Sequence, residues 1–257
     1  MGVLSSNTLF HYTNKMDYLI KILENDFSPR ISIENLSTDI TNEIGIPMVS
    51  FCDIPLSQVS NHSMTYGKYG IGLTKEWGQR MGITPVMYFH NSANHFKPFN
   101  IATDKLKSDI YGIEPQYSFE MYSHIMYITW FHKLYEGLMW KDNKYMEKKF
   151  YDEREWRYIP SLGSMYDSGI TKMSYFDEDV KKLKHDIDFK EMINIELGKE
   201  FKLKFTPNDI KYLIVDKETE ILKMISRVKK LKHKYGEDEI HLLITRIVSM
   251  ESIENDF

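Results

Sequence analysis

Cysteine is almost absent from this sequence, because Cys52 is the single cysteine among 257 residues. A lone cysteine cannot form a disulfide within the chain, and it rules out the thiolate clusters that hold structural metals. Residues 1–10 also lack the basic and then apolar segment that is typical of a secretory signal. We therefore expect a protein of the reducing cytoplasm.

Long hydrophobic runs are also missing. The apolar stretch 121–140 is interrupted by His124, His132, Lys133 and Glu136, whereas a membrane-spanning helix needs about 20 predominantly apolar residues. This excludes an integral membrane protein, and we expect no membrane partner. The net charge of −4 argues against a strongly basic coat for nucleic acid, although a local patch could still hold phosphates.

Glycine-rich nucleotide motifs and metal-binding motifs are absent as well. The glycines between Ser63 and Gly72 do not form the dinucleotide fingerprint at the start of a helix, so the sequence argues against a Rossmann or P-loop fold. No two histidines stand four residues apart with an acid nearby. The sequence therefore predicts no metal site.

The chain does have enough apolar material for a core. Hydrophobic residues make up 42% of its 257 residues, a length near the upper end of what one core supports. We therefore expect a single domain over residues 1–257. Strands interleave irregularly with a few helices, which argues against a doubly wound parallel sheet and favours an α+β fold.

Hydrophobic spacing and capping residues predict the individual elements. Strands are expected over residues 9–12, 47–52, 69–73, 85–90, 155–159, 210–215 and 241–248, with a hairpin over residues 192–205. Helices are expected after caps at Thr13, Asp53 and Thr74, and over residues 117–140 and 218–231. Residues 28–46 lack periodicity and are expected to form a loop.

Two short segments contain the most informative polar residues. The first strand, 9–13, places His11 where its ring can face a cleft or serve as a structural hydrogen-bonding group. In the charged segment 153–157, strand alternation places Glu153 and Glu155 on one face. Two close carboxylates resist simultaneous ionisation unless a cation or ligand offsets them. The segment is either a site or a solvated edge strand with ion pairs.

Several weaker signals have ordinary structural interpretations beside the functional ones. Tyr66 and Tyr69 accompany glycines and could stack on a flat ring. Cys52 could act as a nucleophile with His62 as its base, but buried strand cysteines are far more often packing residues. The cationic end of helix 218–231 could hold a nucleic acid backbone, but a solvated helix face is more common.

Four of these segments, 9–13, 49–56, 66–73 and 153–157, resemble the AbiGi family of abortive-infection proteins, as does the C-terminal segment 247–257. The resemblance spans nearly the whole chain. Proteins of this family carry the label of antitoxin in a phage-resistance pair, which implies a cognate partner. Their opening histidine strand and later Glu-x-Glu look like those of ADP-ribosyltransferases, including toxins that modify nucleic acids.

The resemblance to ADP-ribosyltransferases implies mixed or antiparallel β-sheets flanked by helices. It also implies NAD as the substrate, bound without a metal. By this resemblance His11 would anchor a ribose of NAD, within a binding strand that includes Tyr12 and Thr13. Tyr66 or Tyr69 would stack on the nicotinamide ring.

The same resemblance implies roles for the two glutamates. Glu155 would orient the nicotinamide ribose and stabilise the positive charge that develops on the sugar as nicotinamide leaves. Glu153 would position or deprotonate the acceptor, which is a nucleic acid or a protein.

Three functional hypotheses follow. The leading one is an NAD-dependent ADP-ribosyltransferase toxin or effector in phage defence, which predicts NAD turnover that depends on Glu155. The alternative is a non-catalytic antitoxin or sensor, which predicts partner binding that survives the substitution Glu155→Ala. The third is an RNA-cleaving effector that uses His11 with another histidine, which predicts metal-independent RNA cleavage without NAD.

Overall fold

The structure of the protein is a computed structural model that describes residues 6–35, 43–59, 66–90, 92–93, 124–141, 143–167, 175 and 178–256. Its first half contains β1 (Thr8–Thr13), α1 (Met16–Asn25), β2 (Arg30–Asn35), β3 (Glu43–Cys52), the 3-10 helix η1 (Leu56–Gln58), β4 (Tyr69–Thr74), α3 (Lys75–Arg80), β5 (Thr84–Pro85) and β6 (Met87–Phe89).

The second half begins with two strand pairs and ends with helices around the last two strands. It contains β7 (His132–Leu134), β8 (Gly137–Lys141), β9 (Lys144–Lys148), η3 (Phe150–Glu153), β10 (Glu155–Tyr158), α6 (Leu162–Asp167), α7 (Glu178–His185), α8 (Ile187–Glu200), η4 (Pro207–Asp209), β11 (Ile210–Val215), η5 (Glu218–Glu220), α9 (Ile221–Lys229), η6 (Lys230–His233), α10 (Glu237–Ile244), β12 (Ile247–Ser249) and α11 (Met250–Asp256).

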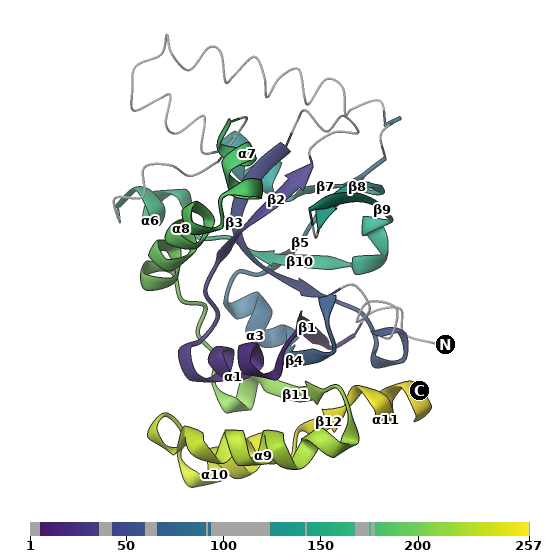
Figure 1. The fold of residues 1–257 in the computed structure, drawn as a ribbon, viewed down its shortest axis with the longest axis vertical. Coiled ribbons are helices and arrows are strands. Elements are labelled where there is room, and N and C mark those ends of the chain that lie inside the picture. The colour runs from purple at the N-terminus through teal and green to yellow at the C-terminus, as the bar shows by residue number, and fades with distance from the viewer. Residues whose placement is uncertain are drawn as a thin grey trace.

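A mixed sheet runs through the centre of the fold in the order β12-β11-β4-β1-β3-β10-β5 (Figure 1). Neighbouring strands in this order pair antiparallel, except that β11 and β12 are parallel. The first strand of the chain therefore lies near the middle of the sheet. This topology confirms the expected α+β fold with a mixed sheet flanked by helices.

Strand β3 is divided between two sets of partners. Residues 43–48 pair with β2, whereas residues 49–52 pair with β10, and Cys52 also reaches Phe10 of β1. Side chains from β1, β2 and β10 are thereby brought together around the middle of β3. The candidate site lies at this junction.

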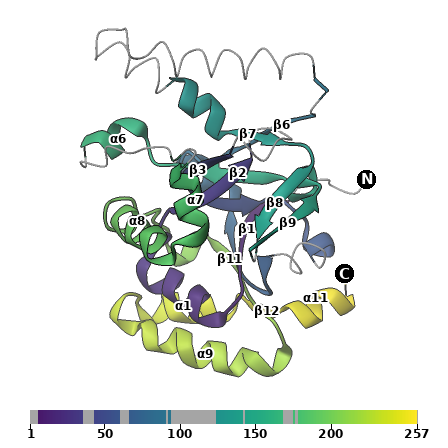
Figure 2. The same cartoon turned by 45° about the horizontal axis from the view of Figure 1, so that its top comes forward.

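Neighbouring residues of a strand point to opposite faces of the sheet. At β1 both of these faces are covered by a hydrophobic cluster. On one face Leu9 lies in a cluster with Trp77 and with residues of α1, α9 and α10. On the other face Phe10 lies in a cluster with Ile214 and with Met250 of α11. Figure 1 shows α9 and α10 together beyond β11, and Figure 2 shows α1 beside α9. Strand β1 is therefore held rigidly from both sides.

A second core cluster lies over the other half of β3. Ile44 and Ile46 of β3 belong to it together with Trp130, with Leu183 of α7 and with Leu197 of α8. Helices α7 and α8 therefore cover β2 and the first half of β3. This packing sets the position of the start of α8 relative to β2.

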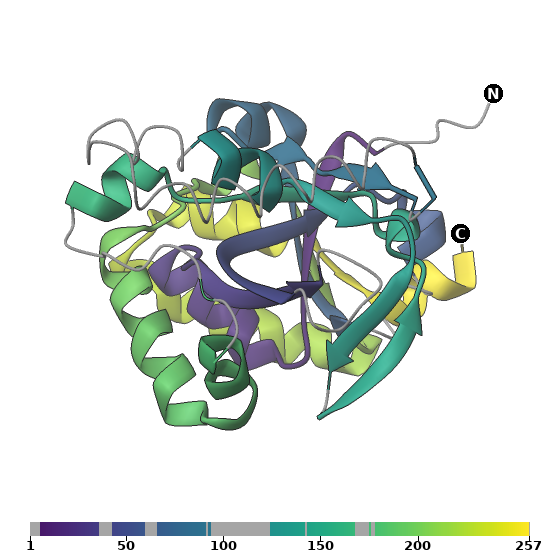
Figure 3. The same cartoon turned by 90° about the horizontal axis from the view of Figure 1, so that it is seen from above.

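The β8–β9 hairpin forms its own two-stranded antiparallel sheet and lies to one side of the main sheet (Figure 3). The rings of Trp140 and Tyr145 are 4.9 Å apart, and the ammonium of Lys184 lies 4.9 Å above the Trp140 ring. Lys184 also pairs with Glu43 of β3. The hairpin is thus attached to α7 and β3 by aromatic and ionic contacts.

Several sequence-based predictions are confirmed. The strands expected at residues 9–12, 47–52, 69–73, 155–159 and 210–215 correspond to β1, β3, β4, β10 and β11. The hydroxyl of Thr74 accepts a hydrogen bond from the Trp77 backbone N–H at 3.1 Å, so Thr74 caps α3 as expected. The helix expected at 218–231 corresponds to η5, α9 and η6, and the strand expected at 85–90 is divided between β5 and β6.

Two predictions near the C-terminus are wrong. The hairpin expected at 192–205 is replaced by α8 up to Glu200, because Ile193 and Leu197 stand four residues apart and bury one helix face. The strand expected at 241–248 is replaced by α10 and the short β12, since Ile240 and Leu243 lie on a buried helix face. In both segments the apolar spacing fits a helix better than a strand.

The long helix expected at 117–140 is also wrong in its second half. Residues 117–123 lie outside the described residues, residues 124–130 are helical, and β7 and β8 follow. Strand β7 pairs in parallel with β6, and this long-range pairing overrides the local helical spacing.

The loop expected at 28–46 is wrong as well, because β2 and the start of β3 pair with each other there. The two N-terminal helix caps also differ from expectation. Lys15 rather than Thr13 occupies the N-cap position of α1. Asp53 does not cap a helix, because its carboxylate pairs with Lys75 at 2.6 Å, and the only described helix that follows it up to residue 59 is η1.

Candidate functional site

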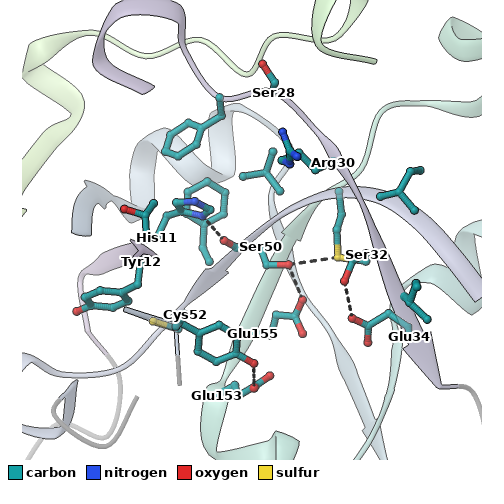
Figure 4. Close-up of a pocket in the computed structure, with 18 of the residues that line it drawn as sticks. His11, Tyr12, Ser28, Arg30, Ser32, Glu34, Ser50, Cys52, Glu153 and Glu155 are labelled. Carbon is teal, nitrogen blue, oxygen red and sulfur yellow. Dashed lines mark hydrogen bonds between the residues drawn. The ribbon is translucent and has the colours of Figure 1, made fainter. Parts of the chain in front are cut away.

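A cavity of about 1110 Å³ lies between β1, β2, β3 and the β8–β9 hairpin. Figure 4 shows a close-up of its polar residues. Those used below are His11, Tyr12, Thr13, Ser28, Arg30, Glu34, Ser50, Tyr66, Lys133, Glu153, Glu155, Lys190, Glu191 and Lys202. Four of the five residues expected to bind NAD by resemblance, and both glutamates, line this cavity.

His11 faces the cavity from the centre of the sheet. Its Nδ1 lies 2.8 Å from the carbonyl oxygen of Ser50. Because a carbonyl only accepts hydrogen bonds, Nδ1 carries the proton, and in a neutral ring Nε2 is left as an acceptor. Burial lowers the pKa of His11, and the Ser50 carbonyl only partly offsets this effect. The ring is therefore neutral near pH 7 and can accept a hydrogen bond from a ligand hydroxyl.

Ser50 connects His11 to Glu155, and the sequence interpretation missed it. Its carbonyl accepts from His11, and its hydroxyl donates to Glu155 Oε1 at 2.9 Å (Figure 4). The residue is the half-buried polar position in a strand whose neighbours Val49 and Phe51 are buried. A polar residue at one position of an otherwise apolar strand was the signal that could have revealed it.

Glu155 is buried and both of its carboxylate oxygens are occupied. Oε1 accepts from Arg157 Nε at 2.6 Å, and Oε2 accepts from Lys133 Nζ at 2.5 Å and from the Arg157 guanidinium at 3.1 Å. Burial alone would raise the pKa of Glu155, but Arg157 and Lys133 outweigh it and hold the pKa well below its usual range. Glu155 is therefore ionised and already paired with two cations.

Glu153 reaches the same region by a different route from the one expected. It ends η3, and Arg154 has a positive φ of 44°, so Glu153 is not part of the β10 strand. The expectation that strand alternation aligns the two glutamates is therefore wrong. Both nevertheless contact Lys133, which lies 3.0 Å from Glu153 and 2.5 Å from Glu155. A left-handed backbone turn brings the carboxylates together.

The buried charges form one balanced network. Glu34 of β2 accepts from Arg157 at 2.9 Å, and Lys148 of β9 lies 3.3 Å from Glu153. The network, called the cavity-floor network below, contains three carboxylates and three cations: Glu34, Glu153, Glu155, Lys133, Lys148 and Arg157. Glu34 and Lys133 were missed because their segments were assigned to a loop and to a helix.

The remaining expected binding residues divide between the cavity and its surroundings. Tyr12 and Thr13 line the cavity, as does Tyr66, whose hydroxyl donates to Glu153. Tyr69 instead directs its hydroxyl to the two carboxylate oxygens of Glu220, each at 3.0 Å. Of the two tyrosines, Tyr66 therefore lines the cavity and Tyr69 does not.

The suggested Cys52 nucleophile has no base among the described residues. Cys52 is buried, and burial raises the pKa of its thiol well above the usual range. His62, its suggested base, lies outside the described residues. Within the described ranges no group of three His, Cys, Asp or Glu side chains could hold a metal ion. No helix in those same ranges is long and apolar enough to cross a membrane.

The site predicts a two-stage loss of stability in acid. The pKa of His11 is lower in the folded chain than in the unfolded chain. As the pH falls through about 6.5, the unfolded chain therefore binds a proton that the folded chain does not, and the free energy of unfolding decreases. The lowered pKa values of Glu153 and Glu155 stabilise the fold above about pH 4.3, and this stabilisation is lost at lower pH.

Urea unfolding between about pH 8 and about pH 3.5 measures both stages. The variant His11→Gln should remove the stage near pH 6.5, and Glu155→Gln should reduce the one at lower pH. A stability that does not change over this range would contradict the assignment.

Comparison with known proteins places the chain in a family. The family model described as abortive phage resistance protein AbiGi, antitoxin, matches residues 25–216. The abortive phage resistance protein AbiGi of Lactococcus lactis subsp. cremoris is 30% identical over 263 residues, covering 96% of this chain and 98% of that protein. No solved structure matches the chain. The chain therefore belongs to the AbiGi family of abortive phage resistance proteins and has a role in phage defence.

Proposed function

We propose that the chain acts as the antitoxin of an abortive-infection pair and binds a cognate toxin. The description of the family as an antitoxin supports this proposal. The observation that carries it in the geometry is the full occupation of the Glu155 carboxylate by Ser50, Arg157 and Lys133.

The physical argument concerns electrostatics in the cavity. A carboxylate accelerates departure of nicotinamide only if its negative charge stabilises the sugar cation more than it stabilises the ground state. Here Lys133 and Arg157 lie within hydrogen-bonding distance of Glu155, so its charge is already offset. The whole cavity-floor network is balanced between three acids and three cations. This arrangement suits a structural or ligand-sensing role better than transfer chemistry.

Co-expression with the protein encoded as its partner tests the antitoxin proposal. We expect the chain to suppress the partner's toxicity and to co-purify with it, and we expect both results to persist in Glu155→Gln and His11→Gln. The substitutions alter the cavity without changing the surface helices. Toxicity of the chain expressed alone, together with no suppression of the partner, would overturn the proposal.

A second candidate function, transfer of ADP-ribose from NAD, is favoured by one specific observation. His11, Ser50 and Glu155 form a continuous polar connection along the cavity wall, and Tyr66 lies at the same cavity. In this candidate Nε2 of His11 accepts from a ribose hydroxyl, and Glu155 Oε1 exchanges the Ser50 hydroxyl for a second ribose hydroxyl. Tyr66 would stack on the nicotinamide ring.

The same candidate gives Glu153 the task of positioning an acceptor on a nucleic acid or a protein. For that task its carboxylate must exchange the Tyr66 hydroxyl for the acceptor group. The third hypothesis, RNA cleavage by two histidines, loses support, because His11 is the only histidine among the described residues that line the cavity.

Release of nicotinamide from NAD by the purified chain distinguishes the two proposals. ADP-ribosyl transfer predicts release, alone or with cellular RNA, DNA or protein, that falls by at least about 100-fold in Glu155→Gln. The antitoxin proposal predicts no release under any of these conditions. Release that is equal in the wild type and in Glu155→Gln would exclude the assigned role of Glu155.

A further inference from the structure

One end of the cavity is built from the chain that links α1 to β2 and from both ends of α8. Phe27 and Leu203 pair in an isolated bridge, which brings Ser28 next to Lys202. Figure 4 shows Ser28 and Arg30 at the end of the cavity away from Glu153. We call Ser28, Arg30, Lys190 and Lys202 the cationic end of the cavity.

Lys190 is the unusual member of this cationic end. It lines the cavity and is half-buried in the first turn of α8, where a positive charge opposes the helix dipole. No described residue hydrogen-bonds or forms an ion pair with its ammonium. Burial lowers the pKa of Lys190, the like charge of Arg30 adds to the effect, and the negative charge of Glu191 offsets only part of it. A bound anion would therefore stabilise the charged form of this half-buried cation.

The other two cations leave room for such an anion. Lys202 donates to the Ser28 hydroxyl at 2.8 Å, which is a neutral partner. Arg30 donates to both carboxylate oxygens of Glu191, at 2.7 and 2.8 Å, so its charge is offset. The unbalanced positive charge at this end therefore comes from Lys190 and Lys202.

We propose that the cationic end of the cavity binds the phosphate groups of a nucleotide, with Lys190 and Lys202 as the charged donors and the Ser28 hydroxyl as a neutral one. This inference goes beyond the antitoxin role and does not require ADP-ribose transfer. It assigns the cavity a class of ligand that an antitoxin could sense or an enzyme could consume.

Cavity size and the opposite wall favour a nucleotide over a free anion. A cavity of about 1110 Å³ is at the upper end of the range for small-molecule sites and far exceeds one phosphate. Towards its floor, Nε2 of His11 provides an acceptor for a sugar hydroxyl, and Tyr66 provides an aromatic face. The phosphates and the nucleoside would thus contact chemically different ends of one cavity.

Calorimetric titration of the full chain with pyrophosphate, ADP and adenosine tests the proposal. We expect ADP to bind more tightly than pyrophosphate and adenosine to bind weakly. Each of Lys190→Gln and Lys202→Gln should weaken ADP and pyrophosphate binding by about tenfold or more, because each removes a charge-assisted hydrogen bond. Their effect on adenosine should be less than about twofold.

The matched control is Lys199→Gln, which removes the same charge from the exposed surface of the same helix. ADP affinity in this variant should stay within about twofold of the wild type. Equal weakening in Lys190→Gln and Lys199→Gln would show a general charge effect and overturn the proposal. No binding of ADP or pyrophosphate by the wild type at millimolar concentration would also overturn it.

The outcome of the ADP titration can be distinguished from the outcome of the partner-binding test. Partner binding that fails while ADP binding is lost in Lys190→Gln would remove the antitoxin role and keep the phosphate site. Partner binding that persists without any binding of ADP or pyrophosphate would remove the phosphate site and keep the antitoxin role.

Discussion

Substitution of Arg157 by methionine is expected to lower the free energy of unfolding by about 3–5 kcal/mol. Arg157 is fully buried and donates to Glu155, to Glu34 and to the carbonyl oxygen of Trp130. Its removal leaves Lys133, and the more exposed Lys148, beside three carboxylates. An uncompensated buried charge is far more costly than a lost surface pair. Urea unfolding at neutral pH measures the loss.

The control for this prediction is Arg80→Met, which breaks an exposed pair with Asp209. Its cost should stay below about 1 kcal/mol. The effect of Arg157→Met should also shrink as the pH falls below about 4.3, because protonated carboxyls no longer need the cation. A loss of similar size in the two variants would show that the network contributes no more than a surface ion pair.

Substitution of Trp77 by alanine is expected to lower the free energy of unfolding by about 3–5 kcal/mol. The Trp77 side chain is fully buried, and its ring centroid lies 5.5 Å from that of Phe51 and 6.2 Å from that of Phe27. Its indole N–H donates to the Lys204 carbonyl at 3.0 Å, so the substitution also leaves a buried acceptor unsatisfied. The cavity left behind cannot close around so many fixed rings.

The matched control is Trp140→Ala in the β8–β9 hairpin. Trp140 is only half-buried and lies outside the main sheet, so its loss should cost less than about 2 kcal/mol. The same urea titration compares the two variants. Equal costs would mean that the hairpin is as much a part of the core as α3.

Local sequence signals predicted the elements that form around β1 well. Alternation at residues 9–12 and 69–73 and the cap at Thr74 were readable because local and tertiary preferences agree there. Residues 132–134 were misread because β7 forms by pairing with a distant strand, β6. Residues 28–46 were misread although β2 and the start of β3 pair with each other, because their sequence lacks the alternation typical of strands. Single-domain organisation remains a prediction from length.

The sequence predicted individual residues of the candidate site but not the contacts between them. His11 and Glu155 were identifiable from their motifs, and Tyr66 was one of two candidates. Lys133 could not be foreseen, because its role depends on β7 placing it 2.5 Å from Glu155. The pairing of the Glu155 charge with two cations therefore depends on the tertiary structure. This pairing is the reason that we prefer the antitoxin role to the transferase role.

The strand order has a consequence for synthesis of the chain on the ribosome. Strand β4 ends at Thr74, but its neighbour β11 begins at Ile210, so translation leaves one edge of β4 without its partner for on the order of ten seconds. During that interval β1, β3 and β10 can already assemble the walls around His11 and Glu155. Nascent chains halted before Ile210 would present the unpaired edge of β4 to chaperones, whereas the finished chain covers it.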